Sequence, residues 1–123
     1  SKSGWQKFHM GVDLSVPEGT PIRAAQAGKV IFSGKSSEIP AYGILVVIDH
    51  GNGFATLYAH CSQALVKAGD KVNQNDLIAK AGSTGNASGS HVHVELRYRG
   101  TAVNPERYFP PLSKESVLAS MAE

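Results

Sequence analysis

The chain has 123 residues, of which 41% are hydrophobic and 18% are charged, values that suit one soluble globular domain with a modest core. The net charge is +2, and the basic residues are scattered without interleaved aromatic residues, so no nucleic-acid partner is expected. No apolar run is long enough to span a membrane, and the single cysteine, Cys61, excludes an internal disulfide.

Glycine and proline divide the chain into short segments, most of which favour β-structure. Strands are predicted over residues 11–16, within 23–34, over 44–50 and 54–60, in two pieces around a Gly-Asp turn within 64–85, and over 91–100. The sequence HGNG at 50–53 predicts a hairpin. Helical periodicity is found only in residues 112–123, which Ser113 can cap. We therefore expect a mainly β domain, an antiparallel sheet over residues 1–111, followed by a short C-terminal helix over residues 112–123.

The last predicted strand contains two histidines separated by one residue. At the two-residue period of a strand, His91, His93 and Glu95 share one face, and the apolar residues at 92, 94 and 96 share the other. Two imidazoles about 7 Å apart along a strand can lean toward one point. An isolated pair of this kind is more often simply exposed to solvent, so this alternative stays open.

A second motif, His9 followed four residues later by Asp13, needs a bend. In a straight strand the two residues would lie about 13 Å apart, too far to share a metal ion. A helix would bring them together, but Gly11 and Pro17 disfavour it, so a bend at Met10 and Gly11 is expected. Two imidazoles and a carboxylate are the protein ligands of many catalytic zinc sites, which keep a position for water. The chain offers this set with histidines to spare.

The other histidines are more ambiguous. Tyr58 and His60 are expected to point to one face of their strand, with residues 57, 59 and 61 on the other. A lone histidine on a strand is often a surface or satisfied core residue, and His60 allows that interpretation. His50 is assigned to it, because it lies at the mouth of a tight turn. Cys61 is interpreted as a small core residue, since its neighbour His60 points away from it and cannot activate a thiol.

Four blocks of the sequence, at residues 8–30, 42–62, 66–85 and 89–109, resemble in content and order the lysostaphin-type, or LytM-type, zinc endopeptidases. The resemblance covers nearly the whole domain. It implies a β-sheet groove of the duplicated hybrid motif (barrel-sandwich hybrid) type and one zinc ion per chain. It also implies hydrolysis of peptide bonds in the stem or crosslinks of bacterial peptidoglycan.

The resemblance assigns a role to each residue that matches the family's motifs. His9, Asp13 and His93 match the three metal ligands. His60 and His91 match two histidines that hold no metal and act on the water and the transition state. The chain has no H-E-x-x-H motif to supply a glutamate base, and imidazole, with a pKa near ~6.5, suits proton transfer at neutral pH. Which of the two is the base stays open.

The resemblance further implies a peptidoglycan peptide as partner and an extracytoplasmic location, in the periplasm, envelope or medium, with a phage origin as an alternative. We expect a monomeric domain, without membrane insertion of its own, cut from a longer precursor. Ser90, Asn86 and the segment 35–42 depart from the family's pattern beside the groove and put the substrate preference in doubt. A direct D-alanyl crosslink is favoured over a glycine bridge.

Two other functions compete with this interpretation. A non-catalytic module of the same fold could bind cell wall or activate an amidase, but such members typically lose metal ligands, and all five matching residues are present here. Residues 66–82 also resemble half of a biotinyl or lipoyl carrier, although no acceptor lysine stands in a recognisable motif at a hairpin tip.

Overall fold

A computed structural model of the protein describes residues 11–85, 87 and 89–103. Within these residues the fold is nearly all β, and every strand pair is antiparallel, which confirms the predicted fold class. The predicted helix over 112–123 and its boundary with 1–111 lie outside the described residues. In the described part, no helix is long and apolar enough to cross a membrane.

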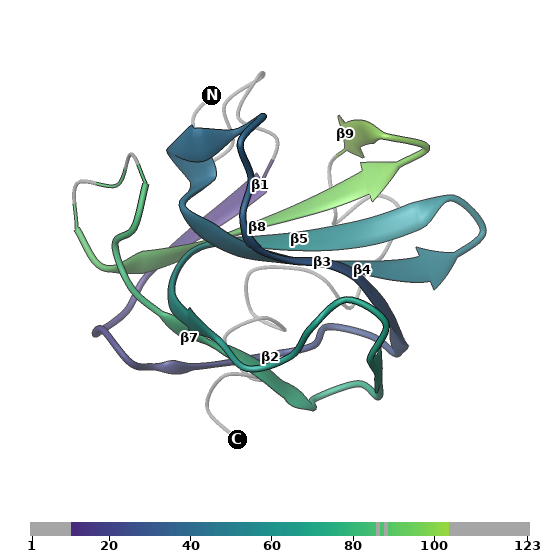
Figure 1. The fold of residues 1–123 in the computed structure, drawn as a ribbon, viewed down its shortest axis with the longest axis horizontal. Helices are drawn as coiled ribbons and strands as arrows, with labels where there is room; N and C mark the ends of the chain where they lie inside the picture. Colours follow the sequence, from purple (N-terminus) through teal and green to yellow (C-terminus); the bar gives the residue numbers. More distant parts are fainter. Residues whose placement is uncertain (1–10, 86, 88, 104–123) are drawn as a thin grey trace.

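One sheet contains all of the described strands (Figure 1). Its main path runs β1-β8-β5-β4-β3-β6, with β7 paired to β5 and β2, and β9 paired to β8. The bounds are β1 Gly11–Ser15, β2 Pro21–Arg23, β3 Gly28–Lys35, β4 Ile44–Gly51, β5 Phe54–Ala64, β6 Lys71–Val72, β7 Leu77–Ala81, β8 His91–Tyr98 and β9 Thr101–Val103; a 3-10 helix, η1, spans Pro40–Tyr42.

The hairpin between β4 and β5 forms where the sequence predicts it. Asn52 has φ 55° and Gly53 has φ 86°, and two positive φ values in a row are what a tight hairpin turn of this type requires. Elsewhere the strands differ in detail from the prediction. The segment 23–34, predicted as one or two strands, contains β3 from Gly28 and only the last residue of β2, which begins at Pro21. Both short strands predicted within 64–85 follow the Gly69–Asp70 turn, and β5 continues to Ala64. The short strand β9 was not predicted.

Two apolar clusters lie on opposite faces of the central strands. The larger cluster takes a buried side chain from each of the strands β1 to β8. The smaller cluster contains Leu45, Leu57 and Ala59, with Tyr42 of η1 packed against it. Because Ala59 pairs with His93, and Tyr58 pairs with Val94 of the larger cluster, the face of the smaller cluster is also the histidine face of β8.

A bulge in β5 changes the face on which His60 lies. Tyr58 belongs to the larger cluster and Ala59 to the smaller, as strict alternation requires. Cys61 then rejoins the larger cluster, the pairing with β4 shifts register at this point, and His60 has φ 64°. The expectation that Tyr58 and His60 point the same way is therefore wrong. An extra residue in the strand turns His60 toward the face of Ala59 and His93.

Candidate active site

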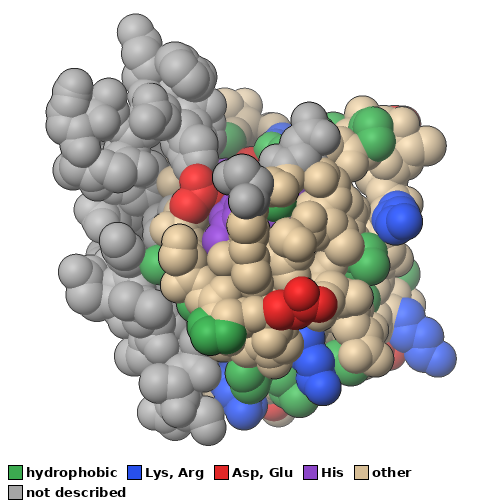
Figure 2. Space-filling view, turned by 90° about the vertical axis from the view of Figure 1, so that its left-hand side faces the viewer, with side chains coloured by type: hydrophobic (Ala, Val, Ile, Leu, Met, Phe, Trp, Pro, Cys, Tyr) green, Lys and Arg blue, Asp and Glu red, His purple; other side chains and the backbone are tan. Residues whose placement is uncertain are grey.

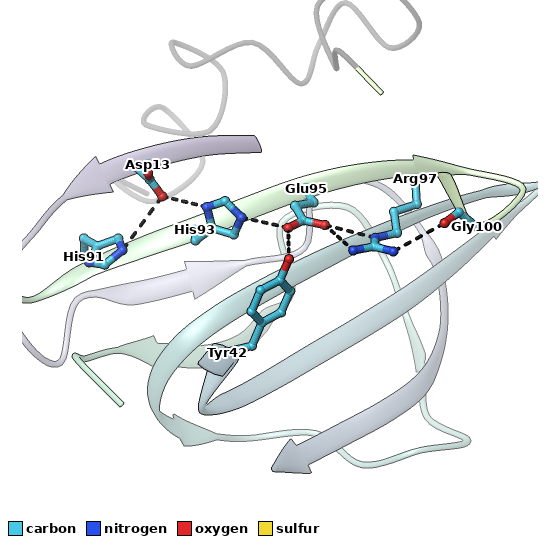
Figure 3. Close-up of polar contacts among 7 residues, drawn as sticks. All are labelled: Asp13, Tyr42, His91, His93, Glu95, Arg97 and Gly100. Atoms are coloured by element: carbon cyan, nitrogen blue, oxygen red, sulfur yellow. Dashed lines mark hydrogen bonds and ion pairs between the residues drawn. The ribbon is translucent and has the colours of Figure 1, made fainter. Parts of the chain in front are cut away.

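The pairing of β1 with β8 places Asp13 directly opposite His93. The Nδ1 atom of His93 lies 2.6 Å from Oδ1 of Asp13, and Nε2 of His91 lies 3.8 Å from the same oxygen. Figure 3 shows both rings turned toward this carboxylate. On the other face of β8, the residues at 92, 94 and 96 are buried. The predicted division of this strand into a histidine face and an apolar face is therefore confirmed.

The ring of His93 lies between two carboxylates. Its Nδ1 atom faces Asp13, and its Nε2 atom is 2.8 Å from Oε2 of Glu95. A neutral imidazole has one N–H and can donate to only one of them. A positive charge at Nδ1, from a proton or a metal cation, satisfies both, so the donor set fits a cation held by Asp13 and His93.

The third expected ligand cannot be placed. His9 and the predicted bend at Met10 lie outside the described residues, as does Asn86. Among the residues that the structure describes, no three His, Cys, Asp or Glu side chains form a complete metal site. Of the three predicted ligands, Asp13 and His93 lie within the described residues, and their side chains are in contact.

Glu95 is the centre of a polar network that the sequence analysis missed (Figure 3). Its side chain is 3% exposed and accepts hydrogen bonds from Nε and Nη2 of Arg97 at 2.9 and 2.8 Å. The hydroxyl of Tyr42 donates to the same carboxylate. The period of the strand placed Glu95 on the histidine face, and Arg97 follows two residues later on the same face. Tyr42 comes from η1 and gave no comparable signal.

These contacts shift the proton affinities of the groups involved. Burial raises the pKa of Glu95, but hydrogen bonds from His93, Tyr42 and Arg97 outweigh it and lower the pKa to about 2. Burial and the hydrogen bond to Glu95 raise the pKa of Tyr42 to about 12. For His93, burial acts to lower the pKa, yet the hydrogen bonds to Asp13 and Glu95 raise it to about 9. Glu95 is therefore a carboxylate that favours positive charge on His93.

His60 completes the cluster from β5. Its ring centroid lies 4.8 Å from that of His91 and 6.2 Å from that of His93. Its Nδ1 atom donates to the carbonyl oxygen of Thr84 at 2.7 Å. Burial lowers the pKa of His60, although the bond to Thr84 opposes that shift. The structure thus brings together four of the five predicted site residues: Asp13, His60, His91 and His93.

His60 and His91 are held as the same tautomer. Nδ1 of His91 lies 3.0 Å from the carbonyl oxygen of Gly89, and Nδ1 of His60 lies 2.7 Å from that of Thr84. A carbonyl oxygen can only accept, so Nδ1 carries the proton on both rings. In its neutral form each ring therefore keeps a lone pair at Nε2, the atom that a proton acceptor needs.

The remaining histidine and the cysteine serve the fold. Nδ1 of His50 donates to Ala27 at 2.7 Å, and Nε2 contacts the hydroxyl of Thr56 at 2.7 Å, which in turn meets the hydroxyl of buried Tyr58 at 2.9 Å. Cys61 is fully buried, and burial raises the pKa of its thiol to about 12. Both structural interpretations made from the sequence agree with these positions.

The cluster reaches the surface of the protein. Figure 2 shows histidine side chains in view on one face, with acidic side chains nearby. Asp13 is 44% exposed and His91 20% exposed, whereas His93 is only 10% exposed. Asp13 and His91 are therefore accessible from solvent, while His93 is largely buried.

The sequence matches the profile of peptidase family M23 over residues 7–105. The uncharacterized lipoprotein YgeR of Escherichia coli K12 is 45% identical over 101 residues, 82% of this chain and 39% of its own length. The DD-carboxypeptidase/endopeptidase Mpg of Neisseria meningitidis serogroup B is 42% identical over 99 residues, 80% of this chain and 22% of its own. The murein hydrolase activator NlpD of Salmonella dublin is 37% identical over 100 residues, 81% of this chain and 26% of its own. The chain thus spans less than half the length of these curated relatives.

Solved structures share the fold. A zinc-containing peptidase from Vibrio cholerae has 38% sequence identity and a TM-score of 0.72, over 77% of this chain and 28% of that one. The catalytic domain of the peptidase lysostaphin from Staphylococcus simulans has 30% identity and a TM-score of 0.74, over 81% and 77%. The resemblance to lysostaphin-type peptidases that the sequence motifs indicated is therefore confirmed.

Proposed function

Because the chain belongs to peptidase family M23, we propose that it is a zinc-dependent endopeptidase that hydrolyses peptide bonds in the stem or crosslinks of bacterial peptidoglycan. The observation that carries the proposal is the convergence of His91 and His93 on Asp13, with Nδ1 of His93 2.6 Å from the carboxylate. His60 meets the same cluster from a neighbouring strand.

His9, Asp13 and His93 would hold one zinc ion. Two neutral imidazoles and one carboxylate leave a net charge of +1 at such a site, which favours an anionic transition state. When bound, zinc supplies a Lewis acid that polarises the scissile carbonyl and acidifies water. The chain's own contribution is to direct Nδ1 of His93 and Oδ1 of Asp13 toward one point.

His60 and His91 would move the protons of the reaction. Hydrolysis transfers one proton from the attacking water and delivers one to the nitrogen that leaves as an amine. The Nε2 lone pair of one ring accepts the first proton, and the other ring, when protonated, donates the second or binds the developing oxyanion. Because His60 and His91 are the same tautomer, either ring can accept the first proton while the other donates the second, so both are assigned to proton transfer.

The second candidate function is that of a non-catalytic module that binds cell wall or activates a murein hydrolase. The likeness to the activator NlpD supports it. The assembled cluster of Asp13, His60, His91 and His93 favours catalysis instead, because a binding module has no need of two histidines held in the same tautomer beside a candidate metal pair.

The relatives support a substrate and a location for the proposed enzyme. Mpg is named a DD-carboxypeptidase/endopeptidase, which supports a D-alanyl bond in a direct crosslink, and YgeR is named a lipoprotein, which supports an extracytoplasmic site of action. The domain is proposed to act there as a monomer.

Digestion of purified peptidoglycan tests the proposal. Sacculi with direct crosslinks and sacculi with glycine bridges are incubated with the zinc-loaded chain, and the products are identified by mass spectrometry. We expect new peptide termini from directly crosslinked sacculi, none with His60→Ala or His91→Ala, and full activity with the control His50→Gln. A wild-type chain that binds sacculi, releases no peptide and stimulates an added amidase would establish the activator function instead.

A further inference from the structure

His93 is held from both sides, and only one of its partners belongs to the proposed ligand set. Nδ1 faces Asp13, and Nε2 lies 2.8 Å from Oε2 of Glu95. A carboxylate oxygen can only accept, so this contact places a proton on Nε2. Nδ1 is then the ring nitrogen left for the cation.

Glu95 is itself fixed in place. A carboxylate that is 3% exposed requires partners that satisfy both of its oxygens. Arg97 donates two bonds to Oε1, while His93 and the hydroxyl of Tyr42 both bind Oε2. Donors from three directions leave the carboxylate one orientation.

Tyr42 connects this network to the rest of the cluster. Its ring makes edge contacts with His93 and His60, at centroid distances of 5.8 and 6.3 Å. The turn that carries it is tightly packed, because a Cβ atom at the next residue, Gly43, would lie 2.4 Å from Oγ1 of Thr84. This packing fixes the position of the turn from which the hydroxyl of Tyr42 reaches Glu95.

We propose that Glu95 is a positioning residue for the metal site: it acts through His93, fixes the ring with Nδ1 toward Asp13, and is held in that role by Arg97 and Tyr42 (Figure 3). This inference depends on the proposed zinc-binding function. A hydrogen-bonded carboxylate behind a ligating histidine orients the ring and strengthens its bond to the metal. Arg97 adds two charge-assisted hydrogen bonds to Oε1, which hold the oxygen that His93 and Tyr42 do not bind.

Zinc affinity, measured on the 123-residue chain by competition with a chromophoric chelator, tests the inference without reference to activity. We expect Glu95→Gln to weaken zinc binding about 10- to 100-fold, and Arg97→Met and Tyr42→Phe to weaken it less. The exposed Glu18→Gln is the matched control and should bind zinc as the wild type does. Side-chain ¹⁵N NMR of the zinc-loaded protein should show His93 protonated at Nε2 in the wild type.

A double variant shows whether Arg97 affects zinc affinity through Glu95 or independently of it. If Arg97 acts through Glu95, Glu95→Gln with Arg97→Met should bind zinc about as weakly as Glu95→Gln alone. Additive losses, or wild-type affinity in both single variants, would overturn the inference. If Glu95→Gln does not fold, the zinc affinities of Arg97→Met and Tyr42→Phe test the inference. Unchanged zinc affinity in both variants would overturn the positioning role of Glu95. A wild-type chain that binds no zinc would instead refute the proposed function.

Discussion

The Nδ1 atom of His60 donates to the carbonyl oxygen of Thr84 across 2.7 Å, and this bond fixes which nitrogen of the ring faces the other histidines. Thr84 is held in turn by its own side chain. Its Oγ1 donates to the carbonyl of Cys61 at 2.6 Å and accepts from the amide of Ile44 at 3.1 Å. Cys61, the residue after His60, thus helps to hold Thr84, whose carbonyl oxygen orients the His60 ring.

Thr84→Val should therefore damage both stability and catalysis. It keeps the shape of the side chain but leaves a carbonyl and an amide without partners, at a cost of about 2 kcal/mol. We expect kcat to fall about tenfold or more, with little change in KM, because His60 loses its alignment. Thr84→Ser keeps the hydroxyl and should restore most of both. Equal kcat in Thr84→Val and wild type would show that Thr84 does not position His60.

The backbone of His60 predicts an unusual order of stability. At φ 64° a residue with a Cβ atom is strained by about 1 kcal/mol or more, and glycine is not. His60→Gly should therefore unfold at a higher urea concentration than His60→Ala. At neighbouring Ala59, which has no positive φ, Ala59→Gly should show the ordinary loss of stability. An alanine variant at 60 more stable than the glycine variant would contradict the bulge geometry.

His50 predicts a dependence of stability on pH. Burial lowers its pKa in the folded protein below the ordinary 6.5, so the unfolded chain takes up the proton first. The stability that His50 contributes is present above pH ~6.5 and is lost as the pH falls below that value. Urea unfolding at pH 8 and pH 5.5 should show that wild type exceeds His50→Gln by more at pH 8. The same gap at both pH values would exclude this effect.

Zinc should stabilise the folded chain. A ligand at 100 times its dissociation constant adds about 2.7 kcal/mol, so the thermal midpoint should rise with zinc and fall with chelator. Asp13→Asn should abolish most of this rise, whereas Asp49→Asn, an exposed aspartate at the β4–β5 hairpin, should keep it. A rise of equal size in Asp13→Asn would show that zinc binds elsewhere.

The sequence predicted the features that follow from short-range periodicity. Alternation on β8 placed His91 and His93 on the same face as Glu95, and the Asn52-Gly53 pair predicted the hairpin. Family motifs identified Asp13 and His60, which pattern alone left ambiguous. His9 and the C-terminal helix remain predictions, since both lie outside the described residues.

Other features depend on contacts between distant segments and could not be predicted. The bulge at His60 becomes visible only in the pairing of β5 with β4, because nothing in the local sequence marks an extra residue. Tyr42 reaches Glu95 only because η1 packs against the loop that contains Thr84. The sequence places these residues dozens of positions apart, and no local pattern connects them.

The bulge in β5 makes regular strand pairing incompatible with the observed position of the His60 ring. Removing one residue at Ala59 or His60 would restore unbroken pairing with β4 and relieve the positive φ, which is the kind of change that selection for heat resistance favours. Deleting His60 would remove the ring itself, and deleting Ala59 would move the histidine into the fully buried position of Ala59, directly opposite His93. Stabilised versions of this domain should therefore keep the defect in β5 and gain their stability elsewhere.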